Sequence, residues 1–165
     1  MDHENHMRHA LRLAENARAA DEVPIGAVIV REDQLLGEGY NQNIFAEDPT
    51  AHGEVVALRE ACAYLNNYRL TGPTTLYVTL EPCPMCFYAM VHARVARLVY
   101  GAPDPKTGYT QFFDADHLAR FNHQIEVIPG VSADECAEVL RTFFREKRDR
   151  GKRKWIKQAH QPPEG

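Results

Sequence analysis

His52-Gly53-Glu54 and, 28 positions further along, Pro82-Cys83-Pro84-Met85-Cys86 are the two stretches that decide how this 165-residue chain is interpreted. His52, Cys83 and Cys86 offer one imidazole and two thiolates, which are ligands that zinc prefers. Three protein ligands leave the fourth tetrahedral position to water, and this open position distinguishes a catalytic zinc site from a closed structural one. The two stretches therefore predict a hydrolytic Zn²⁺ site.

Cys-x-x-Cys motifs also occur in redox proteins and in structural zinc sites, so these alternatives stay open. A structural site needs a fourth ligand, yet Cys62 and Cys136 are isolated and neither has a second ligand-type residue beside it. A redox motif of the thioredoxin kind is expected near the N-terminus after a first strand, whereas this one lies mid-chain between prolines. Both alternatives are less favoured than a catalytic zinc site.

Both motifs are predicted at the starts of helices. Asp48-Pro49-Thr50 is a plausible helix start, with a helix running to about Leu65, and Pro82 is predicted to open the second helix. The two cysteines, three positions apart, would share one face of its first turn. Both helix N-termini would then direct partial positive charge at the site, which favours thiolate over thiol. Bound zinc would lower the pKa of its water and so make hydroxide available near neutral pH.

Glu54 is predicted to be the catalytic residue. A water that attacks an electrophilic carbon must lose a proton, and an amine leaving group must gain one, so one carboxylate beside the metal can do both in turn. The alternative is a solvated acid that is favoured by the dipole of the first helical turn.

The remaining periodicity predicts alternating helices and strands. This order favours an α/β fold with one mixed sheet between helices. The expected elements are a helix over about His6 to Ala20, strands Ile25–Val30 and Leu35–Tyr40 joined by a polar hairpin turn, a strand Thr75–Leu80, the second zinc helix to about His92, a strand Arg97–Gly101, a short helix near Asp114–Leu118, a strand Ile125–Ile128 and a helix from Ser132 onward.

Composition agrees with one compact enzyme domain over residues 1–150, because 44% of the residues are hydrophobic. No apolar run suggests a leader or a membrane span, and two cysteines used as metal thiolates favour a reducing, cytoplasmic location. Between Arg141 and Lys157 nine Lys or Arg face only two acids, although the whole chain carries a net charge of −4. Residues 151–165 are expected to form a basic, partly disordered tail. Such a run is either a solvated face or a site for nucleic-acid phosphates.

The H-x-E and P-C-x-x-C pattern resembles the signature of zinc-dependent nucleobase deaminases. Other stretches resemble the bacterial tRNA-specific adenosine deaminases, and they cover nearly the whole chain: Met7–Leu11, Glu22–Val28, Gly37–Asn41, Asp48–His52, Asn67–Leu70, Leu76–Cys83, Asp104–Gly108 and Glu135–Phe144. The resemblance implies a three-layer α-β-α, cytidine-deaminase-like fold with a five-stranded mixed sheet. It also implies conversion of adenosine to inosine at the wobble position of a tRNA anticodon loop, with release of ammonia, by a homodimer that binds one Zn²⁺ per subunit.

The resemblance also implies the substrate contacts. Asn41 would donate to and accept from the purine edge, and a wall of three residues would line the pocket. A loop of three further residues would contact nucleotides that flank the target. The wall consists of Val23, Pro24 and Ile25, and the loop residues are Asp104, Lys106 and Thr107.

Two features depart from the family pattern. The family has Ala at the position of Gly53, whose missing methyl group is expected to enlarge or loosen the site slightly. It has small residues where this chain has Tyr109-Thr110-Gln111-Phe112-Phe113, which is expected to cap the pocket, to stack on nucleic acid, to narrow the entrance or simply to pack inside. The alternatives are therefore a deaminase of a free base or nucleoside, of guanine or cytosine type, and a zinc-stabilised RNA-binding module without catalysis and with four protein ligands.

Overall fold

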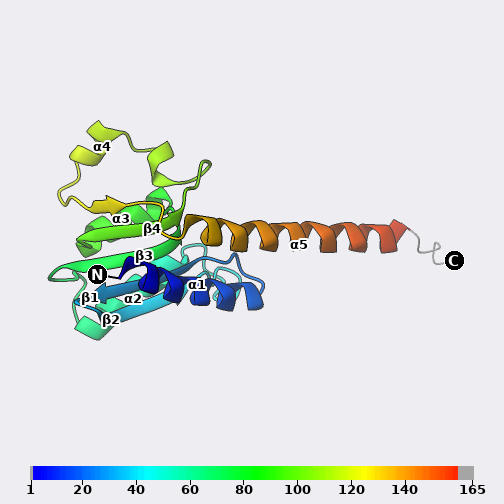
Figure 1. Ribbon diagram of the computed structural model, residues 1–165, viewed down its shortest axis with the longest axis horizontal. Helices are drawn as coiled ribbons and strands as arrows, with labels where there is room; N and C mark the ends of the chain where they lie inside the picture. The colour runs from blue at the N-terminus through cyan, green and yellow to red at the C-terminus, as the bar shows by residue number, and fades with distance from the viewer. Residues whose placement is uncertain (1, 160–165) are drawn as a thin grey trace.

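The computed structural model describes residues 2–159, and these form a single mixed sheet between two layers of helices (Figure 1). This confirms the expected three-layer α/β fold with five strands. The elements are α1 His3–Ala19, β1 Gly26–Arg31, β2 Gln34–Tyr40, α2 Gly53–Leu65, β3 Thr74–Leu80, α3 Pro84–Ala93, β4 Arg97–Ala102, a 3₁₀ turn at Tyr109–Gln111, α4 Ala115–Ala119, β5 Glu126–Ile128 and α5 Ala133–Ala159.

The strands lie in the order β2-β1-β3-β4-β5. β1 pairs antiparallel with both β2 and β3, whereas β3, β4 and β5 run parallel. The β1–β2 connection is a tight hairpin in which Glu32 and Asp33 have φ of 50° and 64°, as the primed turns of right-twisted hairpins require. The parallel strands need crossovers, and α3 provides the one between β3 and β4.

Alternating side chains of the strands feed two cores, one on each face of the sheet. On one face, Val28, Tyr77 and Val99 pack with residues of α1 and α5. On the other, Ile29, Val78 and Leu98 pack with residues of α2 and α3. The metal motifs therefore lie on helices that share one face.

Gly39 lets α2 approach β2 closely. A Cβ atom on this residue would lie 2.7 Å from the backbone nitrogen of Ala57 and 2.7 Å from the carbonyl oxygen of Gly53, which no side chain tolerates. The Gly37–Asn41 segment, which is one of those that resemble the family, is thus the surface against which α2 packs.

Both predicted helix starts at the motifs were wrong. Asp48 caps its own turn, accepting hydrogen bonds from the N–H and hydroxyl of Thr50 at 2.8 and 2.7 Å, so α2 begins only at Gly53. Pro82 stays in the extended connection, and Pro84 opens α3, because the fixed φ of proline suits the first helical position.

The last helix, α5, extends beyond residue 150, the expected end of the domain. Residues 151–159 continue α5 without a break, where a partly disordered tail is expected, and the rest of that predicted tail lies outside the described residues. In Figure 1 the C-terminal part of α5 projects away from the sheet. Two ion pairs tie this helix to the end of α1: Arg18 with Glu146 at 2.9 Å, and Arg150 with Asp21 at 2.9 Å.

Candidate metal centre and active site

The three predicted metal ligands lie where two helices begin. His52 is the residue before α2 and Cys83 the residue before α3, both with extended backbone, and Cys86 follows in the first turn of α3. The positive ends of both helix dipoles therefore meet here, which favours anionic ligands.

The structure brings these ligand atoms together. His52 Nδ1 is 3.6 Å from Cys83 Sγ and 3.4 Å from Cys86 Sγ, and the three atoms lie within 4.8 Å of one another. Within residues 2–159 this is the one group of three or more ligand-type residues able to hold a metal ion. Cys62 and Cys136 are free thiols elsewhere, so the described residues offer no fourth cysteine for a closed site.

The two thiols of the group shift each other's pKa in opposite directions. The hydrogen bond from the Cys86 thiol is the main cause that lowers the pKa of Cys83 to about 4, while the same bond and burial raise the pKa of Cys86. The hydrogen bond with Cys83 also raises the pKa of His52. The low pKa of Cys83 favours the thiolate, which is the form that binds a metal ion.

Glu54 lies on α2, two residues after His52, and is 3% exposed. Its Oε2 is one of two buried side-chain oxygen atoms of the described chain that lack a hydrogen-bond partner there. Burial raises the pKa of this carboxyl to about 7. A buried carboxyl with one unpartnered oxygen and a near-neutral pKa has the properties of a proton-transfer group rather than of a solvated helix-start acid.

Asn41 directly links the sheet to the metal-motif helix. Its side chain is buried, and Oδ1 accepts the Gly53 N–H at 2.7 Å, which satisfies one of the free amides at the start of α2. Its backbone N–H donates to the carbonyl oxygen of Ile25 at 3.1 Å. The predicted pocket wall is therefore joined to Asn41; within it, Pro24 is buried, whereas Val23 and Ile25 are half-buried.

Gly53 differs from the expectation. A Cβ atom there would meet the Ile25 carbonyl oxygen at 3.1 Å and the Tyr40 Cα at 3.2 Å. The missing methyl group thus eases the contact between α2 and the backbone of the sheet, and the structure does not show the predicted enlargement beside the ligands.

The loop that carries Asp104, Lys106 and Thr107 is organised by its own hydrogen bonds. Asp104 Oδ1 accepts the N–H groups of Lys106 and Thr107, both at 3.0 Å, and Oδ2 accepts the Thr107 hydroxyl at 2.7 Å. Burial alone would raise the pKa of Asp104, but these hydrogen bonds outweigh it and hold the pKa below its ordinary value. The Asp104 carboxylate thus shapes the loop, and Lys106 is exposed.

The aromatic segment after this loop divides between core and surface. Tyr109 is buried and stacks on Phe87 of α3 with ring centroids 4.2 Å apart. Phe113 is half-buried and packs edge-on against Phe121. Phe112 remains 58% exposed. Inward packing was expected of Phe112 and Phe113, and it describes Phe113 but not Phe112, while Tyr109 is also packed inside.

Two buried glutamates beside these loops were not identified from the sequence. Glu22 is 2% exposed and accepts the Ile44 N–H at 2.8 Å, which holds the segment between Asn41 and His52. Glu81 is 4% exposed and bonds to the loop after β4. Their partners are mostly loop N–H groups, which carry no sequence signature.

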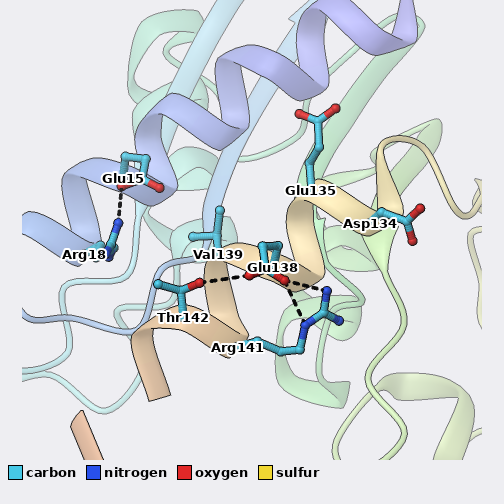
Figure 2. Close-up of a pocket in the computed structure, with 8 residues that line it drawn as sticks. All are labelled: Glu15, Arg18, Asp134, Glu135, Glu138, Val139, Arg141 and Thr142. Carbon is cyan, nitrogen blue, oxygen red and sulfur yellow. Dashed lines mark hydrogen bonds and ion pairs between the residues drawn. The ribbon is translucent and has the colours of Figure 1, made fainter. Parts of the chain in front are cut away.

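Of the surface grooves along α5, two differ clearly in the charge of their lining. One, of about 530 Å³, lies between α1 and α5, and Figure 2 shows Arg18 turned toward Glu15 and Arg141 toward Glu138, so its cations face acids. The other, of about 570 Å³, lies where Lys106 meets a neighbouring side of α5, and none of its lining residues is acidic. Its remaining lining residues are Leu140, Arg141, Phe144, Arg145 and Arg148.

Comparison with known proteins places this chain among the deaminases. A family model described as MafB19-like deaminase matches residues 1–148. The tRNA-specific adenosine deaminase of Haemophilus influenzae is 49% identical over 154 residues, which cover 90% of this chain and 87% of that protein.

Solved structures agree with this. One from a study of A-to-I editing by tRNA:A34 deaminases at the wobble position of transfer RNA is 40% identical, has a TM-score of 0.76, and spans 82% of this chain and 99% of that one. A guanine deaminase from Nitrosomonas europaea also superposes with a TM-score of 0.76, but at 26% identity over 85% of this chain and 83% of that one.

Proposed function

This chain belongs to the MafB19-like deaminases and to the tRNA-specific adenosine deaminases, and we therefore propose that it converts adenosine to inosine at the wobble position of a tRNA anticodon loop. The reaction consumes one water and releases ammonia. The observation that carries the proposal is the 49% identity to a tRNA-specific adenosine deaminase over 90% of this chain, together with a metal-ligand triad that has a buried carboxyl beside it.

Zinc fits the ligand group. With bonds of about 2.3 Å to sulfur and about 2.0 Å to nitrogen, tetrahedral zinc would separate a sulfur from a nitrogen ligand by about 3.5 Å. The two sulfur–nitrogen distances, 3.6 and 3.4 Å, lie on either side of this value. His52, Cys83 and Cys86 would hold the ion, which when bound supplies Lewis acidity and lowers the pKa of a water molecule.

Glu54 would move the protons. It takes a proton from the water that attacks C6 of the purine, and delivers it to the ring nitrogen N1. A second proton passes through the same carboxyl to the departing amine, so the group ends in its starting state. The buried, unpartnered Oε2 and the pKa near 7 suit both directions of transfer.

The target base would lie between Asn41 and the Val23–Ile25 wall. Because Asn41 Oδ1 is fixed by the Gly53 N–H, the orientation of the whole amide is set before substrate binds. A base that enters the site must first leave its stack, and the half-buried Val23 and Ile25 provide apolar surface for its face.

The RNA backbone would follow the groove between Lys106 and α5. Arg141, Arg145 and Arg148 are four and three positions apart and therefore share one face of the helix. Together with Lys106 they place positive charges beside the loop predicted to contact flanking nucleotides. This groove therefore offers a path for phosphates from the site to the projecting part of α5.

The proposed homodimer has a candidate interface on the outer face of α2 and α3. An apolar groove of about 390 Å³ runs between the two helices, and most of its lining residues are apolar: Val55, Leu58, Arg59, Cys62, Tyr68, Ala89, His92 and Ala93. Substituting Ala89→Arg would place a bulky charge in it, and sedimentation should then detect monomers if the groove is the interface.

Within residues 2–159 no helix has the length and apolar character to cross a bilayer. The four free cysteines fit a reducing, cytoplasmic location.

The decisive experiment compares substrates. Purified protein is incubated with an anticodon stem-loop that carries a wobble adenosine and, in parallel, with free nucleosides and bases, while ammonia and inosine are measured. Inosine in the RNA alone supports the proposal. Turnover of a free base alone, guanine in particular, would favour the second candidate, which the structural similarity to a guanine deaminase suggests.

A further inference from the structure

Glu81 lies at the junction between the metal motif and the loop that follows β4. Its backbone N–H donates to the carbonyl oxygen of Ala102, the last residue of β4, at 2.8 Å. The next carbonyl, that of Pro82, accepts the Tyr109 N–H at 2.8 Å. The segment that leads into Cys83 is therefore hydrogen-bonded to Ala102, just before the loop of residues 104–110, and to Tyr109 near the end of that loop.

The carboxylate of Glu81 is directed into the same loop. Oε2 accepts the hydroxyl of Thr110 at 3.0 Å and its N–H at 3.3 Å, and Oε1 accepts the Asp104 N–H at 3.4 Å. None of the ion pairs between described residues includes Glu81. A buried carboxylate is costly unless it is paired, so these loop donors are what compensates its charge.

Gly108 shows how closely the loop follows this side chain. A Cβ atom at this position would overlap Glu81 Oε2 and would also lie 2.6 Å from the carbonyl oxygen of Asp104. Both ends of the loop, at Asp104 and at Thr110, thus close around one carboxylate, and only glycine fits where the chain passes over it.

We propose that Glu81 is a positioning residue that fixes the 104–110 loop relative to the metal motif and thereby sets the affinity for nucleotides flanking the target adenosine. This inference rests on the proposed function, in which Lys106 and Thr107 contact those nucleotides. Glu81 itself touches no reacting atom. It acts by holding the loop in the conformation that binds RNA, so its contribution belongs to substrate binding rather than to the chemical step.

Two substitutions test this role. In Glu81→Gln the side chain keeps its size but has only one acceptor oxygen, so an NH₂ group must face either the Thr110 or the Asp104 N–H. Thr110→Val removes the hydroxyl donor and keeps the branched shape. Losing a hydrogen bond to a charged group corresponds to about a tenfold change in an equilibrium constant, or more.

Two readouts separate positioning from general support. For Glu81→Gln we expect amide hydrogen exchange in residues 103–112 to be about tenfold faster or more, KM for the anticodon stem-loop to rise about tenfold, and kcat and metal content to stay unchanged. Thr110→Val should shift the same quantities less, and the double variant should be less affected than the two single changes combined. Glu126→Gln is the control, because Glu126 is exposed and pairs with Arg97 at the other end of β4.

Unchanged exchange in both Glu81→Gln and Thr110→Val would overturn the inference. A fall in metal content and kcat with KM unchanged would overturn it as well, since Glu81 would then support Cys83 rather than the loop. If Glu81→Gln does not fold, Thr110→Val decides alone. A wild-type protein that makes no inosine in RNA contradicts the proposed function instead, and the exchange measurement still tests whether Glu81 holds the loop.

Discussion

Removing the cations of the groove between Lys106 and α5 should reduce the salt dependence of RNA binding by a calculable amount. Arg141 is paired with Glu138 at 2.8 Å, so Lys106, Arg145 and Arg148 are the three cations counted as contacts to phosphates. Each such contact contributes about 0.7 to 0.9 to the slope of log K against log salt concentration. Between 50 and 200 mM salt, one contact is therefore about a threefold effect, and three contacts are about 20- to 40-fold.

The assay is fluorescence anisotropy of a labelled anticodon stem-loop, measured in a Glu54→Gln background so that the substrate is not consumed. The triple alanine variant at these positions should lose about two units of slope, because all three side chains are exposed and their removal leaves the core intact. Arg12→Ala is the control, since Arg12 is an exposed arginine of α1 that does not line this groove. A triple variant with the slope of the wild type would refute the assignment of this groove to the RNA backbone.

Three further outcomes are expected. Glu54→Gln should keep its metal and its melting temperature but lose a factor of about 10² to 10⁴ in kcat, and a near-normal rate in stopped assays of inosine formation would contradict its role as proton carrier. Cys86→Ala should abolish stoichiometric zinc in elemental analysis of the purified protein, and full zinc content would exclude the thiolate as a ligand. Gly39→Ala should destabilise the fold by about 1–3 kcal/mol or more, because its Cβ would lie 2.7 Å from backbone atoms of α2, and unchanged thermal unfolding would contradict this packing.

The ligand group was predictable because its chemistry is local. One imidazole and two thiols at that spacing have few other uses, and strand-to-helix connections bring them to one face of the sheet. The helix starts were less predictable. Asp48 is a residue type that often caps helices, yet its carboxylate accepts hydrogen bonds from Thr50 in the turn before α2. Proline is equally ambiguous, and only the structure separates Pro82 from Pro84.

The buried glutamates were not predictable for a different reason. Nothing in the residues next to Glu22 and Glu81 marks them as buried, and acidic side chains are ordinarily solvated. They are buried by loops whose Ile44 and Thr110 N–H groups donate to them. These are tertiary contacts, which the local sequence does not indicate. The direction of the missing methyl group at Gly53 is likewise set by the neighbouring strand rather than by the motif.

The ion pairs between α1 and α5 give the basic helix a fixed rotational setting. Glu146 and Arg150 face α1, while Arg141, Arg145 and Arg148 line the groove with Lys106, so one side of α5 anchors the helix and another presents charge. A single residue inserted just before Glu146 would turn everything beyond it by about 100° relative to the sheet. An uncharged inserted residue would leave the net charge of the chain unchanged, yet either the anchoring residues or the groove arginine beyond the insertion would face the wrong way. For this helix, the rotational position of the charged side chains matters as much as their charge.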